Sequence, residues 1–313
     1  MKTDKCLYCF EQTTNTNLHE GCSKKFYGTT VPPVLDFTAA DMYDLATKVI
    51  GERVTVPGVQ TKISMGVNKA DKKQSRFTII GLWGEYILKP PCAEYPFMPE
   101  NESLTMKLAE YFGIQTVPNS LVRLKSGELA YITRRIDRVG KSKLPMEDMA
   151  QLTGRLTEQK YRGSLEQVGK AIAKYSSNPG FDLLNFFELN LFSFLTGNAD
   201  MHLKNFSIIH KNNMYSLAPA YDLLSTRLLI PEDKDNEESA LSMNGKKRKF
   251  NRPDFLQFST TLGIAPKALE NTLSAFSNKI KNAERLISNS FLESESQDMY
   301  LELMIERAKR IGI

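Results

Sequence analysis

The sequence has 313 residues, of which 41% are hydrophobic and 25% are charged, so it can bury a large core and is expected to form two lobes. Its formal net charge of +5 is too modest to require nucleic acid as a partner, and its apolar runs are too short or too interrupted to cross a bilayer. No signal peptide is recognisable, and the sparse use of cysteine indicates a reducing, cytoplasmic location.

The N-terminal segment, residues 1–30, holds three of the 4 cysteines and one of the 3 histidines. Cys6 and Cys9 form one pair with two residues between them, and His19 and Cys22 form a second pair with the same spacing. Because each pair can bind from a tight turn, the pattern predicts a Zn²⁺ site in a small module. Reduced thiols packed without metal, or a site that has lost its metal, fit the same residues.

A turn with one glycine spans Thr55–Lys62 and precedes a β-patterned segment, Ile63–Val67. Backbone N–H groups in such a turn can bind phosphate, although a Pro-Gly turn between strands is common. The segment lacks the Gly-Lys-Ser/Thr of a Walker loop. The residues expected to meet the nucleotide here are Gly58, Val59, Gln60 and Lys62.

A lysine, Lys89, ends the next predicted strand, which starts at Gly84. A cation in this place can reach the α- and β-phosphates of ATP, while a surface lysine is the ordinary alternative. A helix is expected to open at Glu100 and to run through Glu110. Either Glu100 or Glu102 can pair with Lys89, and Glu102 is preferred.

The segment from Asp200 to Asp222 carries the pattern of a phosphoryl-transfer site. A predicted helix at 181–195 precedes it. A predicted hairpin of Phe206–His210 and Met214–Ala218, with its turn at Asn212–Asn213, lies within it. Protein kinases place a catalytic Asp, an Asn five residues later and a second Asp after a short hairpin with this spacing. The residues with these places are Asp200, Asn205 and Asp222, and either His202 or Lys204 between them can donate to phosphate or fix the loop.

Most of the sequence after residue 138 is expected to be helical, whereas the part before it is rich in strands. We therefore predict an α+β, bilobal, protein-kinase-like fold. The expected parts are a Cys/His module at 1–30, a strand-rich N-lobe at 31–138 and a helical C-lobe at 139–313. The other helices expected in the C-lobe are 165–175, 252–262, 266–288 and 294–311.

A basic run at Lys246–Lys249 follows an acidic stretch at 232–238. The run could contact DNA phosphate in a complex or bind a tRNA-associated target. It is also typical of a solvated loop that neutralises its acidic neighbour.

Taken together, these motifs resemble the HipA-type serine/threonine kinases, the toxins of bacterial toxin–antitoxin systems. The stretches that carry the resemblance are 58–62, 86–90, 100–102, 135–138, 144–149, 197–207 and 219–222. The resemblance implies that Lys89 binds the nucleotide, that Asp200 is the catalytic base and that Asn205 and Asp222 hold Mg²⁺. It also implies a hinge at 133–136, where the backbone of Arg134 and Ile136 meets adenine.

The family further implies regulation and partners. Thr55 stands where relatives can be autophosphorylated, although between Val54 and Val56 it also fits an ordinary strand residue. The sequence resembles the short HipT form, which implies a separate HipS-like partner and a HipB-like DNA-binding antitoxin. The implied substrate is a protein Ser or Thr, on an aminoacyl-tRNA synthetase. A small-molecule kinase of the aminoglycoside or choline type and a catalytically silent pseudokinase are the alternatives.

Overall fold

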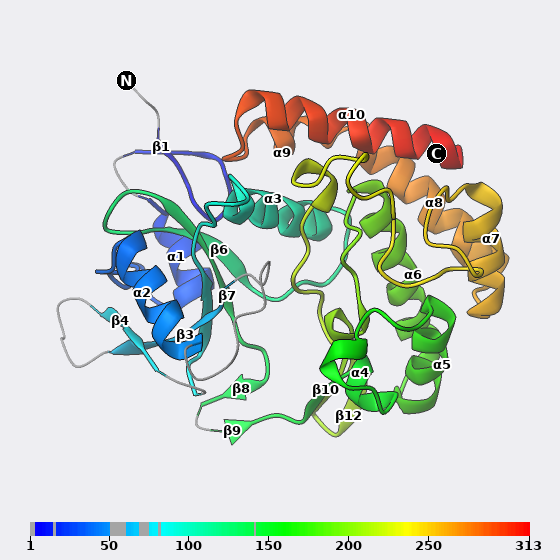
Figure 1. The fold of residues 1–313 in the computed structure, drawn as a ribbon, viewed down its shortest axis with the longest axis horizontal. Helices are drawn as coiled ribbons and strands as arrows, with labels where there is room; N and C mark the ends of the chain where they lie inside the picture. Colours follow the sequence, from blue (N-terminus) through cyan, green and yellow to red (C-terminus); the bar gives the residue numbers. More distant parts are fainter. Residues whose placement is uncertain (1–3, 15–16, 51–60, 69–74, 81–82, 141) are drawn as a thin grey trace. The chain divides into compact units, whose positions relative to one another are not determined.

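The structure, a computed structural model, describes residues 1–313 except 1–3, 15–16, 51–60, 69–74, 81–82 and 141 (Figure 1). The chain divides into two compact units. Unit 1 comprises Met1–Leu104, Val117–Ile136 and Asn289–Leu292, and unit 2 comprises Thr105–Thr116, Asp137–Ser288 and Glu293–Ile313. Within the described ranges, no helix has the length and apolar character needed to span a membrane.

Unit 1 is built on a five-stranded antiparallel sheet in the order β4-β3-β5-β7-β6. Its strands are β3 (Ile63–Asn68), β4 (Arg76–Ile79), β5 (Tyr86–Lys89), β6 (Asn119–Arg123) and β7 (Leu129–Arg134). Gly84 lies just before β5, and a Cβ atom there would come within 2.6 Å of the Met65 carbonyl oxygen. Only glycine therefore allows the chain to enter β5 so close to β3.

Both edges of this sheet are covered by segments that precede it in sequence. At one edge, the carbonyl of Leu7 accepts a hydrogen bond from the N–H of Leu121 on β6. At the other edge, the N–H of Val34 donates to the carbonyl of Ser75, and the N–H of Phe77 on β4 donates to the carbonyl of Val34. Such covering protects edge strands from pairing with other chains. The covering part contains β1 (Asp4–Lys5), β2 (Gln12–Thr13), α1 (Glu20–Tyr27) and α2 (Ala39–Ile50).

The N-terminal segment shares one apolar core with the sheet. Leu7 and Phe26 belong to the same buried cluster as Leu88 on β5 and Leu121 on β6. Aromatic side chains add edge-on contacts, with the Phe26 and Tyr86 ring centroids 5.9 Å apart. The independent module predicted for residues 1–30 stays a prediction, but its apolar side chains pack on the sheet.

The helix predicted to open at Glu100 is α3 (Met98–Tyr111). It begins two residues earlier than expected because the N–H of Asn101 already donates to the carbonyl of Phe97. Its residues from Asn101 to Ala109 are all buried.

Unit 2 is mainly helical. Its helices are α4 (Met149–Leu152), α5 (Leu165–Tyr175), α6 (Pro179–Leu195), α7 (Arg252–Thr261), α8 (Pro266–Ile280), α9 (Glu284–Ser288) and α10 (Ser294–Ile311). It also has β8 (Arg138–Val139), β9 (Ser142–Lys143), β10 (Met146–Asp148), β11 (Ser207–Lys211) and β12 (Met214–Leu217), with short 3₁₀ turns at Thr157–Gln159, Leu203–Asn205 and Thr226–Leu228. The α+β composition, with a strand-rich and a helical part, agrees with the predicted fold class.

One predicted helix is divided in the structure. The single helix expected at 266–288 is interrupted after Ile280 and resumes at Glu284. The amide of Asn282 donates to the carbonyl of Asn278, and the N–H of Ala283 turns back to Ile280. These local bonds replace the regular helical pattern, as short polar side chains often do.

Candidate functional site

The predicted catalytic loop starts where α6 ends in unit 2. Gly197 has φ +71, and a Cβ atom there would lie 2.7 Å from Leu303 and 2.9 Å from Arg227. The glycine therefore serves both the left-handed backbone at the helix end and the close packing around it. The chain leaves the helix here and reaches Asp200 three residues later.

The carboxylate of Asp200 accepts a hydrogen bond from the Tyr161 hydroxyl at 2.9 Å. Burial and the charge of Asp200 together raise the pKa of Tyr161, so this hydroxyl stays protonated and donates. The Tyr161 ring in turn lies edge-on to His202, with centroids 5.2 Å apart. Tyr161 lies 39 residues from Asp200 and belongs to no sequence motif, so the sequence pattern does not predict this contact.

His202 is buried, and its Nδ1 atom has no hydrogen-bond partner among the described residues. Burial lowers the pKa of His202, while the charges of Asp200 and Asp222 both act to raise it. Both carboxylates are thus close enough to influence one imidazole. The charges of the predicted base and of the second acidic residue thus affect the pKa of His202 in the same direction.

Asn205 is oriented by the backbone of the residue predicted as the base. Its Nδ2 donates to the carbonyl oxygen of Asp200 at 3.3 Å. With the amide nitrogen used in this bond, Oδ1 is the atom left to act as a ligand. An amide oxygen together with the Asp222 carboxylate provides the hard oxygen donors that Mg²⁺ prefers, so the residues fit this ion.

Asp222 follows the hairpin of β11 and β12, which has the predicted turn at Asn212–Asn213. It has φ +57, a backbone conformation that non-glycine residues rarely adopt. Its neighbour Tyr221 donates from its hydroxyl to the carbonyl of Lys204 at 2.9 Å and contacts the Ser207 hydroxyl at 2.6 Å. These bonds attach the Asp222 segment to the catalytic loop.

Lys204 forms an ion pair with Asp148 at 2.7 Å. Asp148 also caps α4, since its Oδ1 accepts from the N–H of Gln151. Two roles are predicted for Lys204, donation to phosphate and fixing of the loop. The ion pair with Asp148 fits the second role.

In unit 1, Lys89 and Glu102 form a buried ion pair with 2.5 Å between Nζ and Oε1. The Lys89 ammonium also lies 5.3 Å from the centroid of Tyr131, its partner on β7. Glu102, rather than Glu100, is thus the acid that meets Lys89. Glu100 is not fully buried, and burial raises its pKa to about 7.

Most of the predicted phosphate loop lies outside the described residues. This holds for Thr55, Gly58, Val59 and Gln60. Lys62 is described and exposed. In the predicted hinge, the N–H of Arg134 donates to Pro118 and that of Arg135 donates to Glu85. The Val117–Ile136 segment of unit 1 ends with this predicted hinge.

The four predicted zinc ligands of unit 1 come together in the structure. The Sγ atoms of Cys6, Cys9 and Cys22 and a ring nitrogen of His19 all lie within 4.8 Å of one another. Burial, followed by the charges of the other two cysteines, raises the pKa of Cys22 to about 12. Burial also acts to raise the pKa of Cys6, but hydrogen bonds from backbone groups outweigh it and lower that pKa to about 7.

The basic run of unit 2 is paired with acidic residues. Lys246 lies 2.7 Å from Asp254, and Lys247 lies 3.3 Å from Glu237. These contacts fit a loop that neutralises its acidic neighbours.

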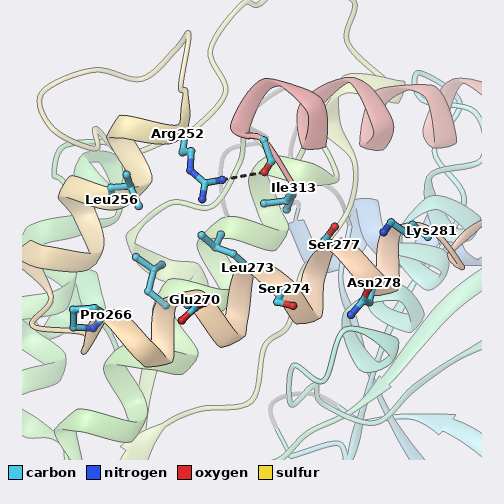
Figure 2. A pocket seen from close by; sticks show the side chains of 12 residues that line it. Arg252, Leu256, Pro266, Glu270, Leu273, Ser274, Ser277, Asn278, Lys281 and Ile313 are labelled. Atoms are coloured by element: carbon cyan, nitrogen blue, oxygen red, sulfur yellow. Dashed lines mark hydrogen bonds between the residues drawn. The ribbon is translucent and has the colours of Figure 1, made fainter.

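A groove of about 530 Å³ in unit 2 lies along α7, α8 and the last residues of the chain (Figure 2). Arg252 crosses one end and donates to the carbonyls of Ile311 and Gly312. None of the predicted site residues lines this groove.

Residues 54–284 match the family model of the HipA-like C-terminal domain. The chain belongs to this family. A Haemophilus influenzae protein named "Putative kinase" is 28% identical over 83% of this chain and 82% of its own length. A Sinorhizobium fredii protein named "Putative kinase Y4dM" is 35% identical over 63% of this chain, which spans only 50% of that relative.

Solved structures agree on the fold. HipA of Shewanella oneidensis, in a toxin–antitoxin complex with HipB and operator DNA, superposes with a TM-score of 0.67 at 21% identity, over 83% of this chain and 65% of HipA. The Helicobacter pylori proinflammatory kinase CtkA gives 0.52 at 18% identity, over 72% and 87% of the two chains. The resemblance to HipA-type kinases and the kinase-like fold are thereby confirmed, and the relatives imply use of ATP and a divalent metal.

Proposed function

We propose that this HipA-type protein is an Mg-ATP-dependent serine/threonine protein kinase and the toxin of a toxin–antitoxin system. It transfers the γ-phosphate of ATP to a protein Ser or Thr, on an aminoacyl-tRNA synthetase, and thereby inhibits translation. The observation that carries the proposal is the arrangement of the catalytic loop. The Asp200 carboxylate is held by Tyr161, and the Asp200 carbonyl orients the amide of Asn205.

The chemistry assigned to the loop is simple. Asp200 accepts the proton of the acceptor hydroxyl as that oxygen attacks the γ-phosphorus, and the Tyr161 hydroxyl keeps the carboxylate in place. Asn205 and Asp222 are the residues that would hold Mg²⁺, whose charge offsets that of the phosphate oxygens. Lys89, fixed by Glu102, is assigned to the α- and β-phosphates.

The test is incubation of the purified protein with cell lysate and γ-labelled ATP, followed by identification of the labelled proteins. Asp200→Gln should abolish labelling, and Asp233→Asn, which removes an exposed acid elsewhere in unit 2, should not change it. A labelled synthetase that disappears with Asp200→Gln supports the proposal. Labelling that survives Asp200→Gln contradicts the assignment of the base.

The two rivals give different results in the same assay. Phosphate incorporated into a purified sugar or antibiotic, with none in protein, would favour a small-molecule kinase. A pseudokinase would show no thermal shift with Mg-ATP and no labelling at all.

Regulation and partners follow the HipA family in our proposal. The HipB complex of the Shewanella oneidensis protein supports a HipB-like DNA-binding antitoxin, with a HipS-like small protein as the further partner of the short HipT form. Copurification with the products of neighbouring genes tests both, and the absence of any complex contradicts them. Autophosphorylation at Thr55 is tested by mass spectrometry of protein incubated with ATP, with Thr55→Ala as the control.

A further inference from the structure

The side chains of Cys6, Cys9, His19 and Cys22 form a cluster that the transfer reaction does not use. They come from two local structures of unit 1. Cys6 and Cys9 lie on either side of a tight turn, whereas His19 is the N-cap of α1 and Cys22 lies in its first turn. Their four ligand atoms nevertheless all lie within 4.8 Å of one another.

The histidine is held in the state that a metal requires. Its Nε2 lies 3.0 Å from the carbonyl of Gln12, an acceptor only, so Nε2 carries the proton. The lone pair is then on Nδ1, which faces Cys9 Sγ at 3.4 Å and Cys22 Sγ at 3.8 Å. A backbone carbonyl that fixes the ring in this way is typical of metal-bound histidine.

These separations match those of a tetrahedral zinc site. With Zn–S near 2.3 Å and Zn–N near 2.0 Å, a tetrahedral ion places sulfur and nitrogen ligands about 3.5 Å apart. The two separations between sulfur and Nδ1, 3.4 and 3.8 Å, fall on either side of this value. Three thiolates and one imidazole also select Zn²⁺ over Mg²⁺ or Ca²⁺, which prefer oxygen.

We propose that Cys6, Cys9, His19 and Cys22 bind one structural Zn²⁺ ion that fixes the N-terminal segment on the sheet of unit 1. Four protein ligands complete the tetrahedron and leave no position for substrate, so the ion has a structural role.

The position of the turn shows what the ion stabilises. Leu7 lies between the first two ligands, and its carbonyl accepts hydrogen bonds from the N–H of Leu121 at 3.1 Å and the hydroxyl of Ser120 at 3.3 Å. Cys6 and Leu7 are also part of the apolar core around Leu88. Loss of the ion should therefore loosen the segment that covers the β6 edge.

The first test is the metal content of the full-length protein purified from zinc-supplemented cells. We expect about one zinc ion per chain, as a closed four-ligand site binds a single ion. Cys22→Ser should lower the content at least tenfold, whereas Cys92→Ser, at the cysteine outside the cluster, should leave it unchanged. A content near zero in the wild type, or one unaffected by Cys22→Ser, overturns the proposal.

A second test works with the wild type alone, in case Cys22→Ser does not fold. Exchange of zinc for Co²⁺ should give the intense visible absorption of a tetrahedral thiolate site, and a zinc-selective chelator should lower the melting temperature. A colourless cobalt form, or a melting temperature that the chelator does not change, counts against the site.

Discussion

The ammonium group of Lys89 and the carboxylate of Glu102 pair at 2.5 Å inside unit 1, with 3% and 0% of their side chains exposed. A pair so deeply buried costs desolvation energy, so stability alone gives little reason to keep it. A cation held at the end of β5 is, however, what binding of nucleotide phosphates requires.

Replacement of both partners separates the two roles of this pair. Glu102→Gln alone leaves a buried charge unpaired and should destabilise the protein by about 3 kcal/mol or more. The double variant Lys89→Met, Glu102→Leu should recover most of that stability but should not bind ATP. The measurements are the melting temperature and the thermal shift with Mg-ATP.

Glu100→Gln is the matched control, because it neutralises the neighbouring acid and leaves the ion pair intact. It should bind ATP like the wild type. If the double variant still binds ATP, Lys89 is not the nucleotide lysine.

Sequence reasoning succeeded where the pattern is local. Helix α5 has the predicted bounds. In the structure, Ser164 is its N-cap, with a side chain that accepts from the N–H of Gln167, and the apolar residues recur with helical spacing. The turn at Asn212–Asn213 was found for the same reason, because asparagine tolerates the left-handed backbone that a two-residue hairpin needs.

It failed where a contact joins distant residues. Tyr161 lies 39 residues from Asp200, and Asp148 lies 56 residues from Lys204, so no spacing rule connects either pair. In the sequence, Asp148 belongs to the family stretch 144–149, which gives no reason to pair it with Lys204. Such contacts depend on how α4 and the loop after it pack, which is a property of the folded unit.

Tyr161→Phe should slow phosphoryl transfer without preventing nucleotide binding. The variant loses the hydrogen bond to the Asp200 carboxylate, and one such bond at a partly exposed site is worth about 1 kcal/mol, or roughly a fivefold lower kcat. The KM for ATP should stay unchanged.

Steady-state kinetics measure this effect once the substrate is known, and autophosphorylation serves until then. Tyr175→Phe is the control, since among the described residues that hydroxyl accepts a hydrogen bond only from the neighbouring Lys174. Equal rates for the wild type and Tyr161→Phe would show that Asp200 does not need this bond.

A double-mutant cycle of Lys204 and Asp148 tests the loop-fixing role. If Lys204 acts through the ion pair, Lys204→Met and Asp148→Asn should lower the transfer rate and the melting temperature to a similar extent. The double variant should then be no worse than either single variant, with a coupling energy between the two sites of about 1 kcal/mol. If Lys204 instead contacts phosphate, Lys204→Met should lower the transfer rate far more than Asp148→Asn. The measurements are the transfer rate and the melting temperature of all four proteins.

Glu100 should make the stability of the protein depend on pH. Burial raises its pKa from 4.5 to about 7 in the folded state, so between these values the folded chain binds the proton more tightly than the unfolded chain does. The contribution of Glu100 to the free energy of unfolding is therefore greatest when the pH is below its pKa in the unfolded chain. This contribution decreases as the pH rises toward 7. Above that pH, the ionised carboxylate opposes folding.

Glu100→Gln does not titrate and should remove this dependence. Relative to the wild type, the variant should melt higher by roughly a few degrees at about pH 8, and the difference should disappear at about pH 4.5. Melting curves of both proteins across this range measure it, and titrations that the two share cancel in the comparison. A difference that stays constant with pH would mean that the Glu100 carboxyl has the same pKa in the folded and unfolded chains.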